Sequence, residues 1–238
     1  PAMKRALLLL AIALAFPAAA DVVSATPRGV IVAHDGVVEL RAGGRTIWLA
    51  PGLEGVTGIV TGETRIALLD AWSNRARIVS VADGRGTTFA TAETPIDGVF
   101  SGDDLYLVAR DSNRIEQIAG DGTRHSVAVS SDPAFLRAAG GTIYLYSRIE
   151  GVLQELAAGG TRLRVARELA MPPFASDMEI DGNTAYLIYP RTAVMVTANL
   201  DTFEIGSTVD EGGAPTDLAI PRRGNALSAP LCAKPGPA

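Results

Sequence analysis

Three aspartates recur at intervals that match a repeat in the chain, and their type and spacing could support chemistry. Asp97, Asp177 and Asp217 are separated by 80 and 40 residues, and Thr57 and Phe135 occupy the equivalent positions of the other repeats. Carboxylates brought close together raise each other's pKa values, recruit a cation such as calcium, or face a basic partner. The three aspartates are therefore candidate metal ligands. Alternatively, each could cap its own turn by accepting hydrogen bonds from backbone N–H groups.

Other side chains that perform catalysis are few and scattered. His34 and His125 lie far apart in the sequence, without a partner at helix or hairpin spacing, which is typical of structural histidines. The sequence contains no Gly-x-Ser-x-Gly elbow, phosphate-binding loop or haem-attachment motif. The single cysteine, Cys232, falls in a Pro/Ala/Gly-rich tail and is either inert or available for intermolecular pairing. This inventory favours a binding protein over an enzyme, with no resident cofactor and calcium as the one candidate ion.

The elements that would position the aspartates follow a repeat of about forty residues. Four leucines in short aliphatic runs, Leu68, Leu107, Leu145 and Leu187, are separated by 39, 38 and 42 residues. Each run is followed by a polar turn, a second strand pattern, a Gly or Asp turn and a last strand pattern, and each copy ends near a proline. Four strands in about forty residues are typical of one blade of a β-propeller.

Counting the copies predicts an all-β propeller of five four-stranded blades. Residues 29–52 show only three strand patterns, and residues 216–220 match a first strand, so together they predict a composite blade that closes the ring. Six blades are the alternative if residues 225–233 add more sheet, and an open two-sheet sandwich also fits a hairpin-rich chain. The four complete copies span residues 56–95, 96–133, 134–173 and 174–215.

One copy carries a recognisable order of motifs. It runs through Thr94-Pro95-Ile96-Asp97-Gly98-Val99, then Leu105-Tyr106-Leu107-Val108, then Asp111-Ser112-Asn113-Arg114-Ile115. In this order the chain resembles the bacterial propellers of the YVTN and NHL type, over most of residues 29–220. The resemblance implies the fold and the repeat geometry. Such propellers serve as binding scaffolds, accessory subunits and occasionally hydrolases or lactonases. Because the first strand of a blade lines the central channel, the aligned aspartates would form a ring near one mouth.

The N-terminal residues predict export. Met3-Lys4-Arg5 is followed by an apolar run from Ala6 to Phe16, a proline and small residues at A-x-A spacing, which is typical of a secretory signal peptide. Residues 1–20, with Pro1 and Ala2 ahead of the methionine, are therefore predicted to be removed after Ala20, and an uncleaved anchor is the alternative. The propeller is then expected over residues 21–221 and a partly disordered tail over residues 222–238, in a periplasmic or secreted protein.

Charge and composition narrow the functional classes. The chain has 21 basic and 26 acidic residues, and loss of the two basic leader residues gives 19 − 26 = −7. This balance lacks the basic footprint of a nucleic-acid-binding protein. No transmembrane segment is expected in the mature chain. The sequence thus favours a protein-binding scaffold, or an accessory subunit that docks peripherally on a periplasmic or membrane-associated complex. The alternative is a channel-centred, metal-assisted hydrolase or lactonase.

Overall fold

The computed structural model describes residues 22–34, 36–159 and 162–210, and these residues form an all-β structure of five antiparallel four-stranded sheets. Each sheet is built from four strands that are consecutive in the chain. The strands are β1 (Val22–Thr26), β2 (Gly29–His34), β3 (Val37–Ala42), β4 (Arg45–Pro51), β5 (Gly58–Thr61), β6 (Arg65–Asp70), β7 (Arg75–Ser80), β8 (Gly86–Ala90), β9 (Pro95–Ser101), β10 (Asp104–Ala109), β11 (Arg114–Ile118), β12 (Arg124–Ala128), β13 (Pro133–Ala139), β14 (Thr142–Ser147), β15 (Val152–Gly159), β16 (Arg162–Ala170), β17 (Asp177–Asp181), β18 (Thr184–Tyr189), β19 (Val194–Asn199) and β20 (Glu204–Asp210).

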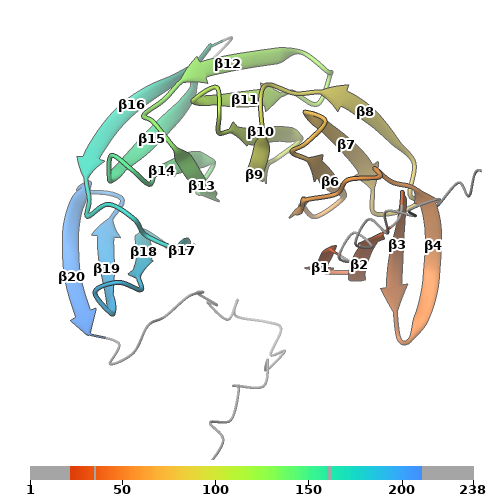
Figure 1. Cartoon of the computed structure of the whole chain (residues 1–238), viewed down its shortest axis with the longest axis horizontal. Helices are drawn as coiled ribbons and strands as arrows, with labels where there is room; N and C mark the ends of the chain where they lie inside the picture. Colours follow the sequence, from red (N-terminus) through yellow and green to blue (C-terminus); the bar gives the residue numbers. More distant parts are fainter. Residues whose placement is uncertain (1–21, 35, 160–161, 211–238) are drawn as a thin grey trace, which may run out of the picture.

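The five sheets stand side by side in an arc around a common axis, as the blades of a β-propeller do (Figure 1). The first strand of each sheet lies nearest the axis and the fourth lies on the outside. Each inner strand contacts the inner strand of the next blade, from β1 to β5, β9, β13 and β17. The prediction of five four-stranded blades is confirmed for the described residues.

We number the sheets, or blades, from 1 (β1 to β4) to 5 (β17 to β20) in chain order. The predicted composite closing blade is wrong, because sheet 1 takes all four of its strands from the N-terminal part of the chain. β1 pairs with β2 along its whole length, from Val22 opposite Ala33 to Thr26 opposite Gly29. The sequence analysis missed β1 because its five residues directly follow the leader and alternate only weakly between apolar and small polar types. Residues 216–220, which were expected to supply the inner strand, lie outside the described residues.

The repeat leucines hold the blades together. Leu68, Leu107, Leu145 and Leu187 lie on the second strands of their blades, and all four are fully buried. Leu68 packs in an apolar cluster between blades 1 and 2, and Leu187 in one between blades 4 and 5. Burial of a leucine side chain contributes about 1.5–3 kcal/mol relative to exposure. The forty-residue spacing therefore reflects one buried anchor per blade.

Two asparagines of the Ser-Asn-Arg turns fix the path from one blade to the next. Asn74 and Asn113 have φ values of 53° and 49°, in the left-handed region that asparagine tolerates better than most residues. Their side-chain oxygens accept hydrogen bonds from the N–H groups of Thr94, at 2.8 Å, and Asp132, at 3.1 Å. Each turn thereby holds the segment that leads into the next inner strand, which sets the position of the channel residues.

Sheet 1 has one face that no described sheet covers. Its other face packs on blade 2 through residues such as Ile31 and Leu40. On the uncovered face, cross-strand pairing places Val23 opposite Val32, and Glu39 opposite Leu49. Large apolar side chains are exposed on this sheet, namely Val23, Val30, Ile47 and Leu49. The end of the arc that sheet 1 forms therefore exposes several large apolar side chains.

Candidate functional site

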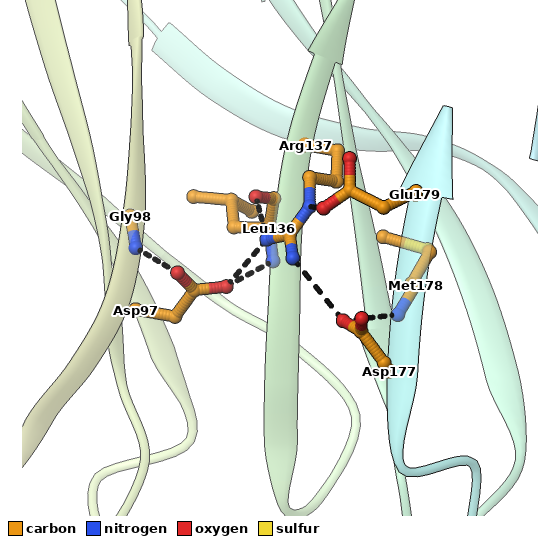
Figure 2. Close-up of polar contacts among 7 residues, drawn as sticks. All are labelled: Asp97, Gly98, Leu136, Arg137, Asp177, Met178 and Glu179. Carbon is orange, nitrogen blue, oxygen red and sulfur yellow. Dashed lines mark hydrogen bonds and ion pairs between the residues drawn. The ribbon is translucent and has the colours of Figure 1, made fainter. Parts of the chain in front are cut away.

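Arg137 joins three neighbouring inner strands through three ion pairs (Figure 2). Arg137 lies on β13, and its Nη1 is 3.0 Å from Oδ2 of Asp97 on β9. On β17, Oδ1 of Asp177 is 3.3 Å from Nη2 and Oε1 of Glu179 is 2.9 Å from Nε. The repeat brings these four residues together, since they occupy the inner strands of three successive blades, with Asp177 and Glu179 both on β17. We call them the Arg137 cluster.

Backbone N–H groups hold the two aspartates as well. Asp97 accepts hydrogen bonds from the N–H of Gly98, at 2.8 Å, and from that of Leu136, at 2.9 Å. Asp177 accepts one from the N–H of Met178, at 2.8 Å. Each aspartate thus accepts a hydrogen bond from the next residue of its own strand rather than from a turn, and both pair with Arg137. Asp217, the third predicted member, lies outside the described residues.

In the Arg137 cluster, burial and the neighbouring charges shift the pKa values in opposite directions. Burial raises the pKa of Asp97, although Arg137 and the two backbone N–H groups act in the opposite direction. Burial alone would lower the pKa of Arg137, but the carboxylates of Asp97, Glu179 and Asp177 outweigh it and raise that pKa above its usual value. Arg137 thus stays charged and supplies the cation that the clustered carboxylates require.

The expected metal ring needs Asp217 and stays a prediction. Within residues 22–34, 36–159 and 162–210, no three His, Cys, Asp or Glu side chains are grouped as metal ligands. Instead, the guanidinium of Arg137 bridges Asp97 and Asp177. The sequence analysis missed Arg137 and Glu179, although each stands two residues after an aligned ring position. Alternate residues of a strand share a face, so this offset was the signal that could have found them.

A pocket of about 320 Å³ opens beside the Arg137 cluster. Its lining combines three arginines and three aspartates with an apolar floor. Arg110 and Arg148 follow the second strands of blades 3 and 4, so they lie at the end of the channel where the inner strands begin. The lining residues are Ile96, Asp97, Arg110, Asp132, Ala134, Phe135, Arg137, Arg148 and Asp177.

Phe135, one of the apolar residues that line the pocket, packs against a buried tyrosine. The ring of Phe135 stacks on that of Tyr146, with centroids 6.2 Å apart and an interplanar angle of 11°. Tyr146 is fully buried; its hydroxyl donates a hydrogen bond to the carbonyl of Pro172, at 2.7 Å, and accepts one from the N–H of Ala175, at 3.2 Å. Burial raises the pKa of Tyr146, so the hydroxyl stays protonated and keeps its donor role. Phe135 therefore rests on a fixed support.

Three exposed apolar side chains stand on the same end of the propeller as the pocket. This end, which we call the turn face, carries the turns between second and third strands and the connections between blades. Trp72 is 86% exposed, Ile149 57% and Phe174 46%, whereas the described turns at the opposite end expose no large apolar side chain. The segments of the turn face are residues 52–57, 71–74, 91–94, 110–113, 129–132, 148–151, 171–176 and 190–193.

The two histidines lie away from this site. Nε2 of His34 is 3.4 Å from Glu39 within sheet 1, and His125 lies on β12, an outer strand. The pocket itself is lined by guanidinium, carboxylate and apolar groups, which are suited to ion pairs, hydrogen bonds and apolar contacts. Cys232 lies outside the described residues.

Comparison with known proteins supports the fold and leaves the family open. No family model matches the chain, and no curated protein matches it. Among solved structures, BamB from Moraxella catarrhalis has a TM-score of 0.61 at 13% identity, over 78% of this chain and 62% of that one. The β-propeller domain of Cps50 (Swd1) from Myceliophteria thermophila has a TM-score of 0.63 at 11% identity, over 82% and 73%.

A third similar structure is hydrazine synthase from Kuenenia stuttgartiensis, with a TM-score of 0.58 at 13% identity, over 65% of this chain. The chain spans 48% of that protein's chain, and less than two thirds of BamB. At these identities the likeness shows the β-propeller fold alone. The expected kinship with the YVTN and NHL propellers therefore stays a prediction.

Proposed function

We propose that this chain is an exported, non-enzymatic β-propeller that binds a protein partner through its turn face. It would act as a scaffold, or as an accessory subunit of a periplasmic or membrane-associated complex. The observation that carries the proposal is the exposure of Trp72, Ile149 and Phe174 on the end of the propeller that also holds the pocket. Exposed apolar side chains grouped on one face mark interaction sites, and tryptophan and arginine dominate binding energy at protein interfaces.

The chemistry of the pocket supports binding more than turnover. A channel-centred hydrolase is the second candidate, because Asp97 has a raised pKa in a pocket and could serve as a general acid. Both oxygens of Asp97, however, accept hydrogen bonds from Gly98, Leu136 and Arg137. An acid that protonates a substrate needs an oxygen that faces the substrate. The geometry therefore favours a structural role for this carboxylate.

Export rests on the leader, which lies outside the described residues. In the described part of the chain, no helix is long and apolar enough to cross a membrane. An exported propeller with an apolar turn face could dock peripherally on the periplasmic side of a larger assembly.

Co-purification from the native host, at native expression, tests the proposal. Tagged wild type is compared with a Trp72→Ser, Ile149→Ser double variant and with Arg85→Ser, a control at the opposite end whose side chain is 90% exposed. We expect one polypeptide in stoichiometric yield with wild type and control, and its loss with the double variant. Equal recovery with all three proteins would contradict the role of the turn face. Metal-dependent ester hydrolysis by a chain without a partner would favour the hydrolase.

A further inference from the structure

Two arginines that line the pocket, Arg110 and Arg148, use only part of their hydrogen-bonding capacity within the described part of the chain. Nε of Arg148 is 2.9 Å from Oδ2 of Asp132, and Nε of Arg110 is 3.4 Å from Oδ1 of Asp111. The terminal Nη1 and Nη2 atoms of both arginines make no hydrogen bond to a described residue. Arg137 differs, because its three nitrogens are all engaged by carboxylates. Arg110 and Arg148 therefore keep donor pairs for another acceptor.

These donors match a carboxylate in both charge and shape. A guanidinium offers two parallel N–H groups that bind the two oxygens of a carboxylate in a bidentate manner. The aspartates that line the pocket are already paired: Arg137 binds Asp97 and Asp177, and Arg148 binds Asp132 through Nε. An added carboxylate would thus meet cationic donors rather than unpaired carboxylates.

The apolar part of the pocket lining favours a ligand that carries an apolar group next to its carboxylate. Ile96, Ala134 and Phe135 provide an apolar surface, and the stack of Phe135 on Tyr146 keeps it in place. The volume of about 320 Å³ lies at the lower end of the range of roughly 300–1,000 Å³ that is usual for ligand pockets. The space therefore suits a single residue or a short acid rather than an extended ligand.

We propose that this pocket is a binding site for a carboxylate joined to a small apolar group. Two sources present this chemistry: the C-terminal residue of a polypeptide, and a free short-chain carboxylic acid. The polypeptide source rests on the proposed function, because the turn-face partner would then insert its C-terminus into the pocket. Arg110 and Arg148 hold the carboxylate, and the apolar group lies on Phe135.

Calorimetric titration with three probes tests the site and separates the sources. The probes are N-acetyl-glycyl-leucine, its C-terminal carboxamide, and isovalerate. We expect the dipeptide acid to bind and the carboxamide to bind at least about tenfold more weakly, since hydrogen bonds to a charged partner are lost. Arg148→Gln and Arg110→Gln should each lower affinity for the acid about tenfold or more. Arg191→Gln is the matched control, because Arg191 lies over the ring of Phe174 on the same face, outside the pocket lining, and should bind as wild type does.

The outcomes are distinct. Tighter binding of the dipeptide acid than of isovalerate supports a polypeptide C-terminus, and equal or tighter binding of isovalerate supports a free acid. Equal binding of acid and carboxamide, no binding of any probe at millimolar concentration, or unchanged affinity in both pocket variants would overturn the proposal. Trp72→Ser should leave probe binding intact. Probe binding without co-purification of a partner would then reject the proposed function and keep the site, and the reverse result would reject the site alone.

Discussion

Replacing Arg137 by methionine removes the cation from the Arg137 cluster while keeping a flexible, unbranched stem in place of the aliphatic part of the arginine. The side chains of the cluster are 13% to 30% exposed, so the site lies between a buried and a surface ion pair. Breaking a buried pair costs about 3–5 kcal/mol, and a surface pair contributes about 0–1 kcal/mol. With three carboxylates left facing one another, we expect a loss of about 2–3 kcal/mol in the free energy of unfolding.

The loss should depend on pH. The pKa of Asp97 in the folded protein is already raised, so its contribution to stability is fully present below its unfolded value of about 4 and declines as pH rises through the folded value. Without Arg137, the folded pKa of Asp97 rises further, because the charge of Arg137 is the largest of the effects that lower it. The folded variant then binds more protons than the unfolded chain above pH 4. Its deficit should therefore be largest near neutral pH and shrink as pH falls towards 4.

Thermal unfolding, followed by circular dichroism between pH 4 and pH 8, measures both effects. A loss of 2–3 kcal/mol corresponds to a fall in Tm of about 4–12 °C near neutral pH for a domain of this size. Arg85→Met, at an exposed pair, is the control and should change stability by less than about 0.5 kcal/mol. In a double variant with Asp177→Asn, the combined loss should be smaller than the sum. An equal Tm in Arg137→Met and wild type, or a deficit that is constant across pH, would refute this reasoning.

Three further predictions concern the cluster, a turn and the leader. Because the guanidinium of Arg137 already bridges Asp97 and Asp177, we expect millimolar calcium to leave the Tm of wild type unchanged; a rise that a chelator reverses would instead support the metal ring predicted from the sequence. Gly151→Ala should lower the free energy of unfolding, measured in urea, more than Gly141→Ala, for which we expect a loss of about 1–2 kcal/mol. Both glycines have positive φ, so both variants strain the backbone. A Cβ at Gly151 would in addition lie 2.4 Å from the carbonyl oxygen of Met171, whereas one at Gly141 meets nothing within 4 Å. Equal losses would contradict the steric argument. The intact mass of protein exported by its native host should correspond to a chain that starts at Asp21, and a membrane-bound species that retains the leader would show that cleavage was wrongly predicted.

The repeat made the blade architecture predictable from the sequence. The leucine spacing gave the period, and a buried anchor on each second strand explains why that spacing persists while other positions vary. β1 was missed because a strand of five short residues carries little periodic signal beside an apolar leader. The count of five blades was nevertheless confirmed, since β1 completes the blade that residues 29–52 had begun.

The candidate site was only half predictable. The alignment assigned Asp97 and Asp177 to equivalent positions of inner strands, and the structure places them on either side of β13, where both pair with Arg137. The pocket could not be predicted, because its floor depends on how Phe135 stacks on Tyr146 across two strands of blade 4. Arg110 and Arg148 follow second strands, outside the aligned inner-strand positions, and no short motif in the sequence places them at the same pocket as Arg137.

Site-specific photo-crosslinking in the native host tests the central claim most directly. A photoreactive amino acid is placed at Trp72 or Ile149 on the turn face, and at Arg85 or Asp121 at the opposite end of the propeller, in a tagged chain at native expression. The claim predicts one discrete crosslinked protein, the same for both turn-face positions and absent for both opposite positions. Crosslinks of equal yield from both ends, or none from the turn face while the chain is folded and exported, would contradict it.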